Sequence, residues 1–137
     1  MKHYVLDACA LLALLQSEQG ADKVVAVLRD AQKGEAMLTM NKLNLLEVYY
    51  KIQRSCGKDD ADRMLGDWMR IPMTVNETIT DELFFEASIL KVRYRISLAD
   101  SVALAEASVS GGELLTADHH EFDVIQQNEK IKFCWIR

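Results

Sequence analysis

Four acidic residues of this chain stand in surroundings that are otherwise apolar. Asp7 is the only charged residue in the run 4–15, and Glu47, Asp100 and Asp118 are each flanked by apolar stretches. A carboxylate in such a run becomes buried or half-buried when the chain folds, and an unpartnered buried charge is costly. Four inward-facing acids in one small domain therefore indicate a site that binds cations.

Helix capping offers a simpler explanation for three of these acids. Asp is among the preferred N-cap residues, so Asp7 and Asp118 are each able to begin the helix that follows. Ser97 and Asp100 have the spacing of a capping box, in which the acid reaches back to the backbone N–H of Ser97. Taken singly, capping is the simpler interpretation at all three positions.

Glu47 has no such explanation. The pattern predicts a helix over residues 42–54, in which Glu47 shares a core-facing stripe with Leu43, Leu46 and Tyr50. Glu is almost never fully buried without a partner. We expect neither Glu47 nor Asp100 to be neutralised by a basic residue on its own helix, which again favours a cation from outside the chain.

The donor atoms of the four acids indicate the kind of cation. Carboxylates gathered in one crevice raise one another's pKa unless a positive charge lies between them. Asp and Glu oxygens suit hard ions, so Mg²⁺ or Mn²⁺ is the expected cofactor. His119 and His120 are interpreted as solvated or as neighbours of the ligands, because adjacent histidines point in different directions and no further pair completes a zinc set.

Alternating strand and helix patterns position these acids. The expected strands are residues 3–6, 36–39, 73–75, 114–116 and 132–136, and the expected helices are 8–15, 21–32, 42–54, 59–71, 79–93 and 97–110, with a helical turn at 122–127. This alternation predicts an α/β domain with a mostly parallel sheet covered on both faces. Asp7 and Asp118 directly follow strands, at the carboxyl ends where sites form in such sheets.

Length and composition set further limits. The chain has 137 residues, half of them hydrophobic, which predicts a single domain over residues 1–137 with a substantial core. Its net charge of −5 argues against a protein that coats nucleic acid through bulk electrostatics. Three cysteines without paired spacing, no secretory signal and no apolar run long enough to cross a bilayer predict a cytoplasmic location and no membrane partner.

The order of the acidic motifs resembles that of the PIN domain family. The resemblance rests on four segments: VLDACALL at 5–12, LLEVY at 45–49, ISLADSVALA at 96–105 and LLTADH at 114–119. It covers the whole chain and is closest to the small stand-alone PIN proteins, the VapC-type toxins of prokaryotic toxin–antitoxin pairs. No single segment is specific, but all four occur in order and on the expected elements.

This resemblance implies a three-layer α/β sandwich whose parallel five-stranded sheet has the order 3-2-1-4-5. It also implies an endoribonuclease that depends on Mg²⁺ or Mn²⁺ and acts as the toxin of a toxin–antitoxin pair. Carried over by position, Asp7, Glu47, Asp100 and Asp118 match the family's catalytic and metal-binding acids, and Thr116 matches a supporting hydroxyl residue. The implied partners are an RNA substrate, an antitoxin and a second copy in a homodimer.

Two positions depart from the family pattern. Cys9 stands where many relatives have Ser or Thr, so a supporting hydroxyl is missing. The spacing from Asp118 to Phe122 is slightly longer than usual, which makes Asp123 a candidate to share the role of Asp118. Neither departure removes an acid, so we expect the site to be active.

Basic residues near the expected crevice are candidates to hold RNA. Lys42 begins the helix that carries Glu47, and Arg93 and Arg95 directly precede the Asp100 segment. Lys51 and Arg54, on the same helix as Lys42, are further candidates, but an ordinary solvated helix face is the simpler interpretation of both.

Two helices carry apolar residues that are predicted to face the core. These residues are Met64, Trp68 and Met69 in the 59–71 helix and Leu83, Phe84, Ala87 and Leu90 in the 79–93 helix. If the first group were partly exposed, it would suit a dimer interface or the amphipathic helix of an antitoxin.

Three other classes of protein share parts of this pattern. A haloacid-dehalogenase-like phosphatase also begins with a strand that ends in Asp, but it needs a second Asp where Cys9 stands. A response-regulator receiver needs an early acidic pair, a mid-chain phosphoacceptor Asp and a late Lys on a strand, and we find no such set. The remaining alternative is a catalytically inactive PIN-like scaffold that binds RNA or a protein partner. Metal binding coupled to nuclease activity separates this scaffold from an enzyme.

Overall fold

The polypeptide folds into a parallel sheet with helices on both faces. A computed structural model describes all 137 residues. The strands are β1 (Lys2–Leu6), β2 (Ala36–Asn41), β3 (Thr74–Asn76), β4 (Glu113–Thr116) and β5 (Lys132–Trp135). The helices are α1 (Ala8–Leu15), α2 (Ala21–Gln32), α3 (Lys42–Cys56), α4 (Lys58–Trp68), α5 (Asp81–Arg93), α6 (Leu98–Ser110) and α7 (His119–Asn128). No helix has both the length and the apolar character that spanning a bilayer requires.

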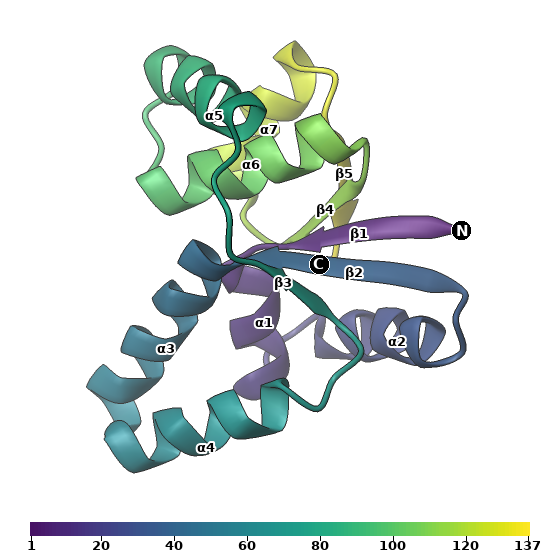
Figure 1. Cartoon of the computed structure of the whole chain (residues 1–137), viewed down its shortest axis with the longest axis vertical. Coiled ribbons are helices and arrows are strands. Elements are labelled where there is room, and N and C mark those ends of the chain that lie inside the picture. Colours follow the sequence, from purple (N-terminus) through teal and green to yellow (C-terminus); the bar gives the residue numbers. More distant parts are fainter.

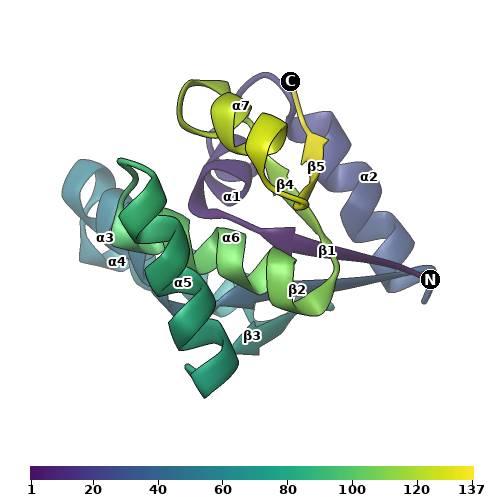
Figure 2. The same ribbon diagram turned by 90° about the horizontal axis from the view of Figure 1, so that it is seen from above.

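The strand order confirms the predicted fold class. Every strand pairs in parallel with its neighbour, and the order across the sheet is β3-β2-β1-β4-β5. Helices α1 to α4 lie on one face and α5 to α7 on the other, as Figures 1 and 2 show. This is the three-layer arrangement that the family resemblance implies.

Each face of the sheet has its own hydrophobic core. Successive residues of a strand point to opposite faces, so Leu6 packs with α1 to α4, whereas Val5 packs with α5 to α7. The central strand β1 pairs with β2 through Tyr4 and Leu38 and with β4 through Val5 and Leu114. β1 is buried at its carboxyl end, so a residue placed there is held on all sides.

Several helix boundaries differ from the prediction by one to three residues, most clearly those of α7, α5 and α4. α7 begins at residue 119 rather than 122, because the side chain of Asp118 accepts a hydrogen bond from the backbone N–H of Glu121 and starts the helix earlier. α5 begins two residues later than predicted, after the N-cap Thr80. α4 ends at Trp68 rather than at residue 71, because Pro72 disfavours helical backbone at the residue before it.

Four apolar side chains that were predicted to face the core are exposed: Leu46, Tyr50, Met69 and Phe84. Leu46 and Phe84 are 54% and 58% exposed, whereas the adjacent Leu45 and Leu83 are buried. The prediction for these four residues was therefore wrong. Apolar spacing identifies a stripe, but the packing of neighbouring helices decides which flank of the stripe is covered. Met64 and Trp68 are buried, as predicted.

The loop between α1 and α2 is held by residues that follow β5. Gly20 has a φ of 97°, and a Cβ at this position would lie 2.6 Å from the carbonyl oxygen of Ile136. The guanidinium of Arg137 donates to the carbonyl of Gln19 at 2.7 Å and lies 3.4 Å from the Glu18 carboxylate. These contacts hold Glu18 beside the carboxyl end of the sheet.

Candidate active site

Asp7 is held at the carboxyl end of the central strand. It follows β1, has extended backbone and is the N-cap of α1, where its Oδ1 accepts a hydrogen bond from the N–H of Ala10 at 2.8 Å. Its Oδ2 accepts a hydrogen bond from the hydroxyl of Thr116 at 2.5 Å. The side chain is 2% exposed. Capping and burial therefore coexist at Asp7, and both carboxylate oxygens have fixed positions.

Burial dominates the electrostatics of Asp7. Loss of solvent raises the pKa of this carboxyl to about 7, although the hydrogen bonds from Thr116 and Ala10 act in the opposite direction. The negative charges of Asp100 and Asp118 raise the pKa further. Asp7 is therefore protonated for part of the time at neutral pH, and a positive charge nearby would ionise it.

The other three predicted acids line one cavity of about 350 Å³. Glu47 comes from α3, Asp100 from the first turn of α6 and Asp118 from the N-cap of α7. Ala8 and Cys9, the two residues after Asp7, line the same cavity, so Asp7 lies directly beneath its wall. The structure thus brings together side chains that are 18 to 111 residues apart in the sequence.

Asp100 is a half-buried acid among other acids. Burial is the main cause that raises the pKa of its carboxyl to about 6, and the charges of Glu47, Asp118 and Glu121 add to this effect. The backbone N–H of Asp100 donates to the hydroxyl of Ser97 at 3.0 Å. The reciprocal bond of a capping box, from the backbone N–H of Ser97 to the Asp100 carboxylate, is absent. The carboxylate lines the cavity beside the side chain of Ser97, whose hydrogen bond lowers its pKa against the effect of burial.

Glu47 corrects two expectations. Leu46 and Tyr50 are exposed, so the stripe they share with Glu47 does not face the core as predicted. Lys51, one helical turn after Glu47, lies 3.5 Å from its Oε1, so Glu47 does have a basic neighbour on its own helix. The side chain of Glu47 is nevertheless only 18% exposed, because it points into the cavity between α3 and α6.

Thr116 connects two of the acids. It is fully buried, and its hydroxyl donates to Asp7 while accepting a hydrogen bond from the backbone N–H of Asp118 at 3.1 Å. Asp123, in contrast, is exposed, does not line the cavity and lies 2.8 Å from Nδ1 of His119. A supporting role for Thr116 or Asp123 stays a prediction, and the geometry favours Thr116.

The three basic residues predicted to hold RNA do not line the cavity. The ammonium of Lys42 lies 3.4 Å from Glu77, and the guanidinium of Arg93 donates to Glu129 at 3.1 Å. Arg95 is exposed. Contacts of these residues with RNA therefore stay predictions, and any such contact lies outside the cavity.

The prediction missed two charged residues of the cavity, Glu18 and Glu121, and it favoured a solvated helix face for a third, Lys51. Glu121 was open to sequence reasoning, because residues three apart lie on one helix face and Asp118 is the N-cap of α7. Lys51 has the same signal, one turn after Glu47. Glu18 has none, because it is the contact between the α1–α2 loop and Arg137 that holds it here.

Cys9 is a neutral thiol at the cavity wall. Burial is the main cause that raises its pKa to about 11, and the adjacent charge of Asp7 acts in the same direction. A thiol that stays protonated is a poor nucleophile and a poor metal ligand. Cys9 therefore lines the wall without adding a charge or a metal ligand, and the acidic chemistry of the cavity belongs to the carboxylates.

The donor set of the cavity fits a hard divalent cation. Its charged ligating atoms are carboxylate oxygens, with no imidazole and only a protonated thiol, which is the chemistry that Mg²⁺ and Mn²⁺ prefer. The raised pKa values of Asp7 and Asp100 indicate carboxylates whose charge lacks a counterion. In the present side-chain positions no three acidic, imidazole or thiol groups converge into a metal cluster. The chemistry of the donors therefore fits, and rotation of side chains would have to complete the coordination.

The sequence matches the PIN domain family over residues 4–127. This match spans most of the 137 residues, and the chain therefore belongs to the PIN domain family. No curated protein matches the chain significantly.

Three solved structures illustrate the similarity in fold. VapBC-1 from nontypeable Haemophilus influenzae has a TM-score of 0.72 at 15% identity, over 98% of each chain. A toxin–antitoxin complex from Klebsiella pneumoniae has a TM-score of 0.68 at 15% identity, also over 98% of each chain. VapC20 from Mycobacterium tuberculosis, a sarcin-ricin loop cleaving toxin, has a TM-score of 0.63 at 17% identity, over 88% of this chain and 94% of that chain. These structures share the fold of the present chain.

Proposed function

We propose that this protein is an endoribonuclease that depends on Mg²⁺ or Mn²⁺ and serves as the toxin of a toxin–antitoxin pair. The observation that carries the proposal is the grouping of Glu47, Asp100 and Asp118 around one cavity whose wall covers Asp7. Membership of the PIN domain family supports a nuclease. The structures that share its fold include a toxin–antitoxin complex and a sarcin-ricin loop cleaving toxin, which supports the role of a toxin.

In this proposal the four carboxylates would bind the metal, and other groups of the chain fix the positions of these carboxylates. A bound divalent ion supplies an acidified water and stabilises charge on a phosphate. Thr116 and the N–H of Ala10 fix the two oxygens of Asp7. Because Asp7 and Asp100 are partly protonated near neutral pH, they release protons when a divalent cation binds, so we expect metal affinity to rise with pH.

A belt of apolar side chains offers surfaces for protein partners. Three hollows of about 200, 370 and 300 Å³ follow one another from α4 across α3 to α5 and α6, and adjacent hollows share lining residues. We name this surface the apolar belt and define it by seven residues: Leu43, Leu45, Leu46, Leu65, Ile79, Phe84 and Leu98. Exposed apolar surfaces of this kind mark interaction sites.

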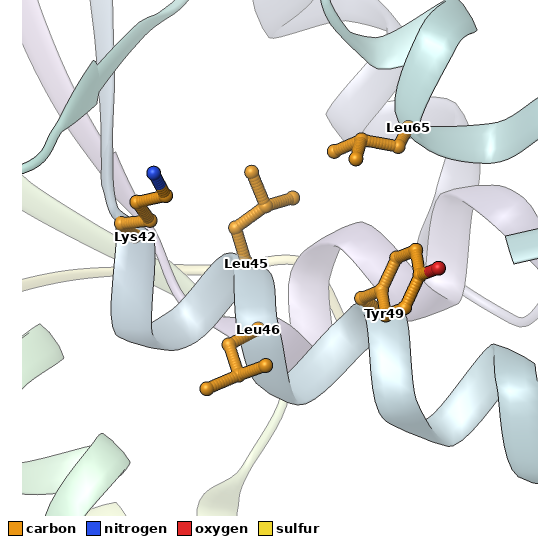
Figure 3. A pocket seen from close by; sticks show the side chains of 5 residues that line it. All are labelled: Lys42, Leu45, Leu46, Tyr49 and Leu65. Carbon is orange, nitrogen blue, oxygen red and sulfur yellow. The ribbon is translucent and has the colours of Figure 1, made fainter. Parts of the chain in front are cut away.

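The α3–α4 end of the belt is assigned to the antitoxin. Figure 3 shows Leu45 of α3 and Leu65 of α4 extending into the space between the two helices, with Tyr49 beside them. An apolar hollow between two helices accepts the anchor residues of an amphipathic helix.

The α5–α6 end of the belt is assigned to a second copy of the chain. Phe84 and Leu98 project from this end and are 58% and 61% exposed. They border a hollow that Leu43, Ala87 and Val102 also line. A surface with both a projecting ring and an apolar hollow is complementary to itself when two copies meet about a twofold axis. The residues Met64 and Trp68 do not serve this purpose, because both are buried.

The decisive experiment is metal removal combined with one substitution. Single-stranded and structured RNAs are incubated with the protein and Mg²⁺ or Mn²⁺, and the assay is repeated with a chelator and with Asp100→Asn. We expect cleavage that the chelator abolishes and that returns when metal is added back. Asp100→Asn should lose cleavage while its circular dichroism spectrum stays native, because the capping bond to Ser97 is made by the backbone N–H of Asp100, which the substitution leaves in place.

The inactive scaffold makes the opposite prediction. It gives no metal-dependent cleavage with any RNA, and Asp100→Asn leaves RNA binding unchanged. The grouping of costly, desolvated acids argues for the enzyme, because a protein that only binds a partner gains nothing from these charges. RNA cleavage that continues in the presence of the chelator and in the Asp100→Asn variant would contradict the proposal.

A further inference from the structure

Lys51 is the only cationic side chain that lines the carboxylate cavity. The remaining charged residues of the lining are acids: Glu18, Glu47, Asp100, Asp118 and Glu121. A cavity lined by five carboxylates repels a phosphodiester, whose charge has the same sign. Any substrate phosphate that approaches this cavity therefore needs a positive charge from the chain in addition to a metal ion.

The ion pair of Lys51 is loose enough to be exchanged. Its ammonium lies 3.5 Å from Oε1 of Glu47, which is longer than a charge-assisted hydrogen bond of about 2.8 Å. The side chain of Lys51 is 45% exposed, so its four-carbon stem is free to move the ammonium toward solvent. Lys42 and Arg93 have partners outside the cavity, Glu77 and Glu129 respectively. Arg137 does not line the cavity and is held in place, because it donates to the carbonyl of Gln19 and pairs with Glu18 at the edge of the cavity.

We propose that Lys51 changes partner during the reaction. In the metal-free protein its ammonium pairs with the carboxylate of Glu47. Once a divalent ion has bound this carboxylate, the ammonium contacts a phosphate of the substrate. This inference rests on the proposed function. The pair between Lys51 and Glu47 keeps the cavity partly neutral before metal binds. When the metal neutralises Glu47 in its place, the ammonium becomes available at the mouth of the cavity.

The first test measures metal binding without RNA. Titration calorimetry with Mn²⁺ compares the wild-type protein with Lys51→Met and Lys51→Gln. Because these substitutions remove a cation that competes for Glu47, we expect Mn²⁺ to bind about two- to fivefold more tightly. Equal or weaker Mn²⁺ binding in both variants would overturn the exchange of partners.

The second test measures RNA cleavage by the same variants. Lys51→Met should raise KM for a single-stranded oligoribonucleotide about tenfold, as expected when one charged hydrogen bond is lost, with kcat nearly unchanged. The slope of log(kcat/KM) against log salt concentration should become shallower by about 0.7, the value for one lost contact with a phosphate of single-stranded nucleic acid. Lys51→Arg keeps the charge and should restore both.

Lys58→Met is the matched control. Lys58 forms an ion pair with Asp62 over the same four-residue helical spacing, but it lies on α4 outside the cavity. Its removal takes away an equal charge and should leave KM and the salt slope as in the wild type. If Lys51→Met behaves as this control does while the wild type cleaves RNA, the inference about Lys51 fails and the proposed function stands. If the wild type cleaves no RNA, the proposed function itself fails.

Discussion

Helix α3 borders two surfaces of opposite character. On one side Glu47 and Lys51 face the carboxylate cavity, and on the other Leu45 and Tyr49 line the α3–α4 hollow of the apolar belt. The cavity gathers charges that lack enough counterions, whereas the belt exposes apolar area that lacks a protein covering. Each surface is therefore unfavourable for the isolated chain, and each is relieved by a different class of ligand: a divalent cation in the first case and another polypeptide in the second.

The largest effect is expected from Asp7→Asn. The loss of a proposed metal ligand should lower RNA cleavage by more than about 100-fold, beyond the 10- to 100-fold typical of residues that only support a ligand. The asparagine oxygen is able to accept the hydrogen bond from Ala10, so α1 keeps its cap. Initial rates of cleavage measure the effect. Asp67→Asn, on the exposed face of α4, should retain full activity.

If Asp7→Asn cleaves RNA at the wild-type rate, the cavity has no special role and its contrast with the belt disappears. If the variant loses both cleavage and self-association, the two surfaces are coupled rather than separate. Binding to the belt is therefore measured on the same variant by light scattering.

The next effect concerns stability and pH in the metal-free protein. The pKa of Asp7 rises from 3.8 in the unfolded chain to about 7 in the folded one, so the folded protein binds more protons between these values. The contribution of Asp7 to stability is then largest below about pH 4 and is lost as the pH rises through 7. The Asp7 contribution to the loss amounts to about 4 kcal/mol above that pH. Asp100, with its pKa raised to about 6, acts in the same direction.

Urea unfolding at several pH values measures this effect as a difference between proteins. The free energy of unfolding of Asp7→Asn should increase relative to that of the wild type as the pH rises from 4 to 8. Saturating Mn²⁺ should remove most of the difference by stabilising the wild type. Parallel pH profiles for the two proteins would show that Asp7 ionises as freely in the folded state as in the unfolded one.

The smallest effect on cleavage is expected in the belt. Phe84→Glu places a charge on the α5–α6 end of the belt and should convert a dimer into a monomer, with the rate of RNA cleavage changed less than about twofold. Because Phe84 is exposed, the free energy of unfolding of the monomer should change by about 0.5 kcal/mol or less. Val124→Glu, at a similarly exposed position on α7, is the control and should leave the dimer intact.

Sedimentation velocity distinguishes the two association states. A wild-type protein that sediments as a monomer at high concentration would remove the assignment of this end of the belt to a second copy. A Phe84→Glu variant that stays dimeric would show that the dimer interface lies elsewhere on the surface.

Local sequence patterns were enough to predict the fold class and the elements that carry the acids. Short apolar runs alternating with helical patterns predict a parallel α/β sheet, because backbone preference and the spacing of buried residues depend on neighbours in the sequence. The same reasoning places Asp7 and Asp118 at strand ends, and the structure has both there. The order of the strands came from the family resemblance, since no local pattern records which strands pair.

Tertiary packing, in contrast, determines which charges and which apolar side chains lie together. Leu45 and Leu46 are indistinguishable as sequence, yet one is buried and the other is 54% exposed, because α4 covers only one flank of α3. Glu18 joins the cavity through a contact with Arg137, which is 119 residues away along the chain. Burial and electrostatic coupling depend on distances between segments that are remote in sequence, and folding alone sets those distances.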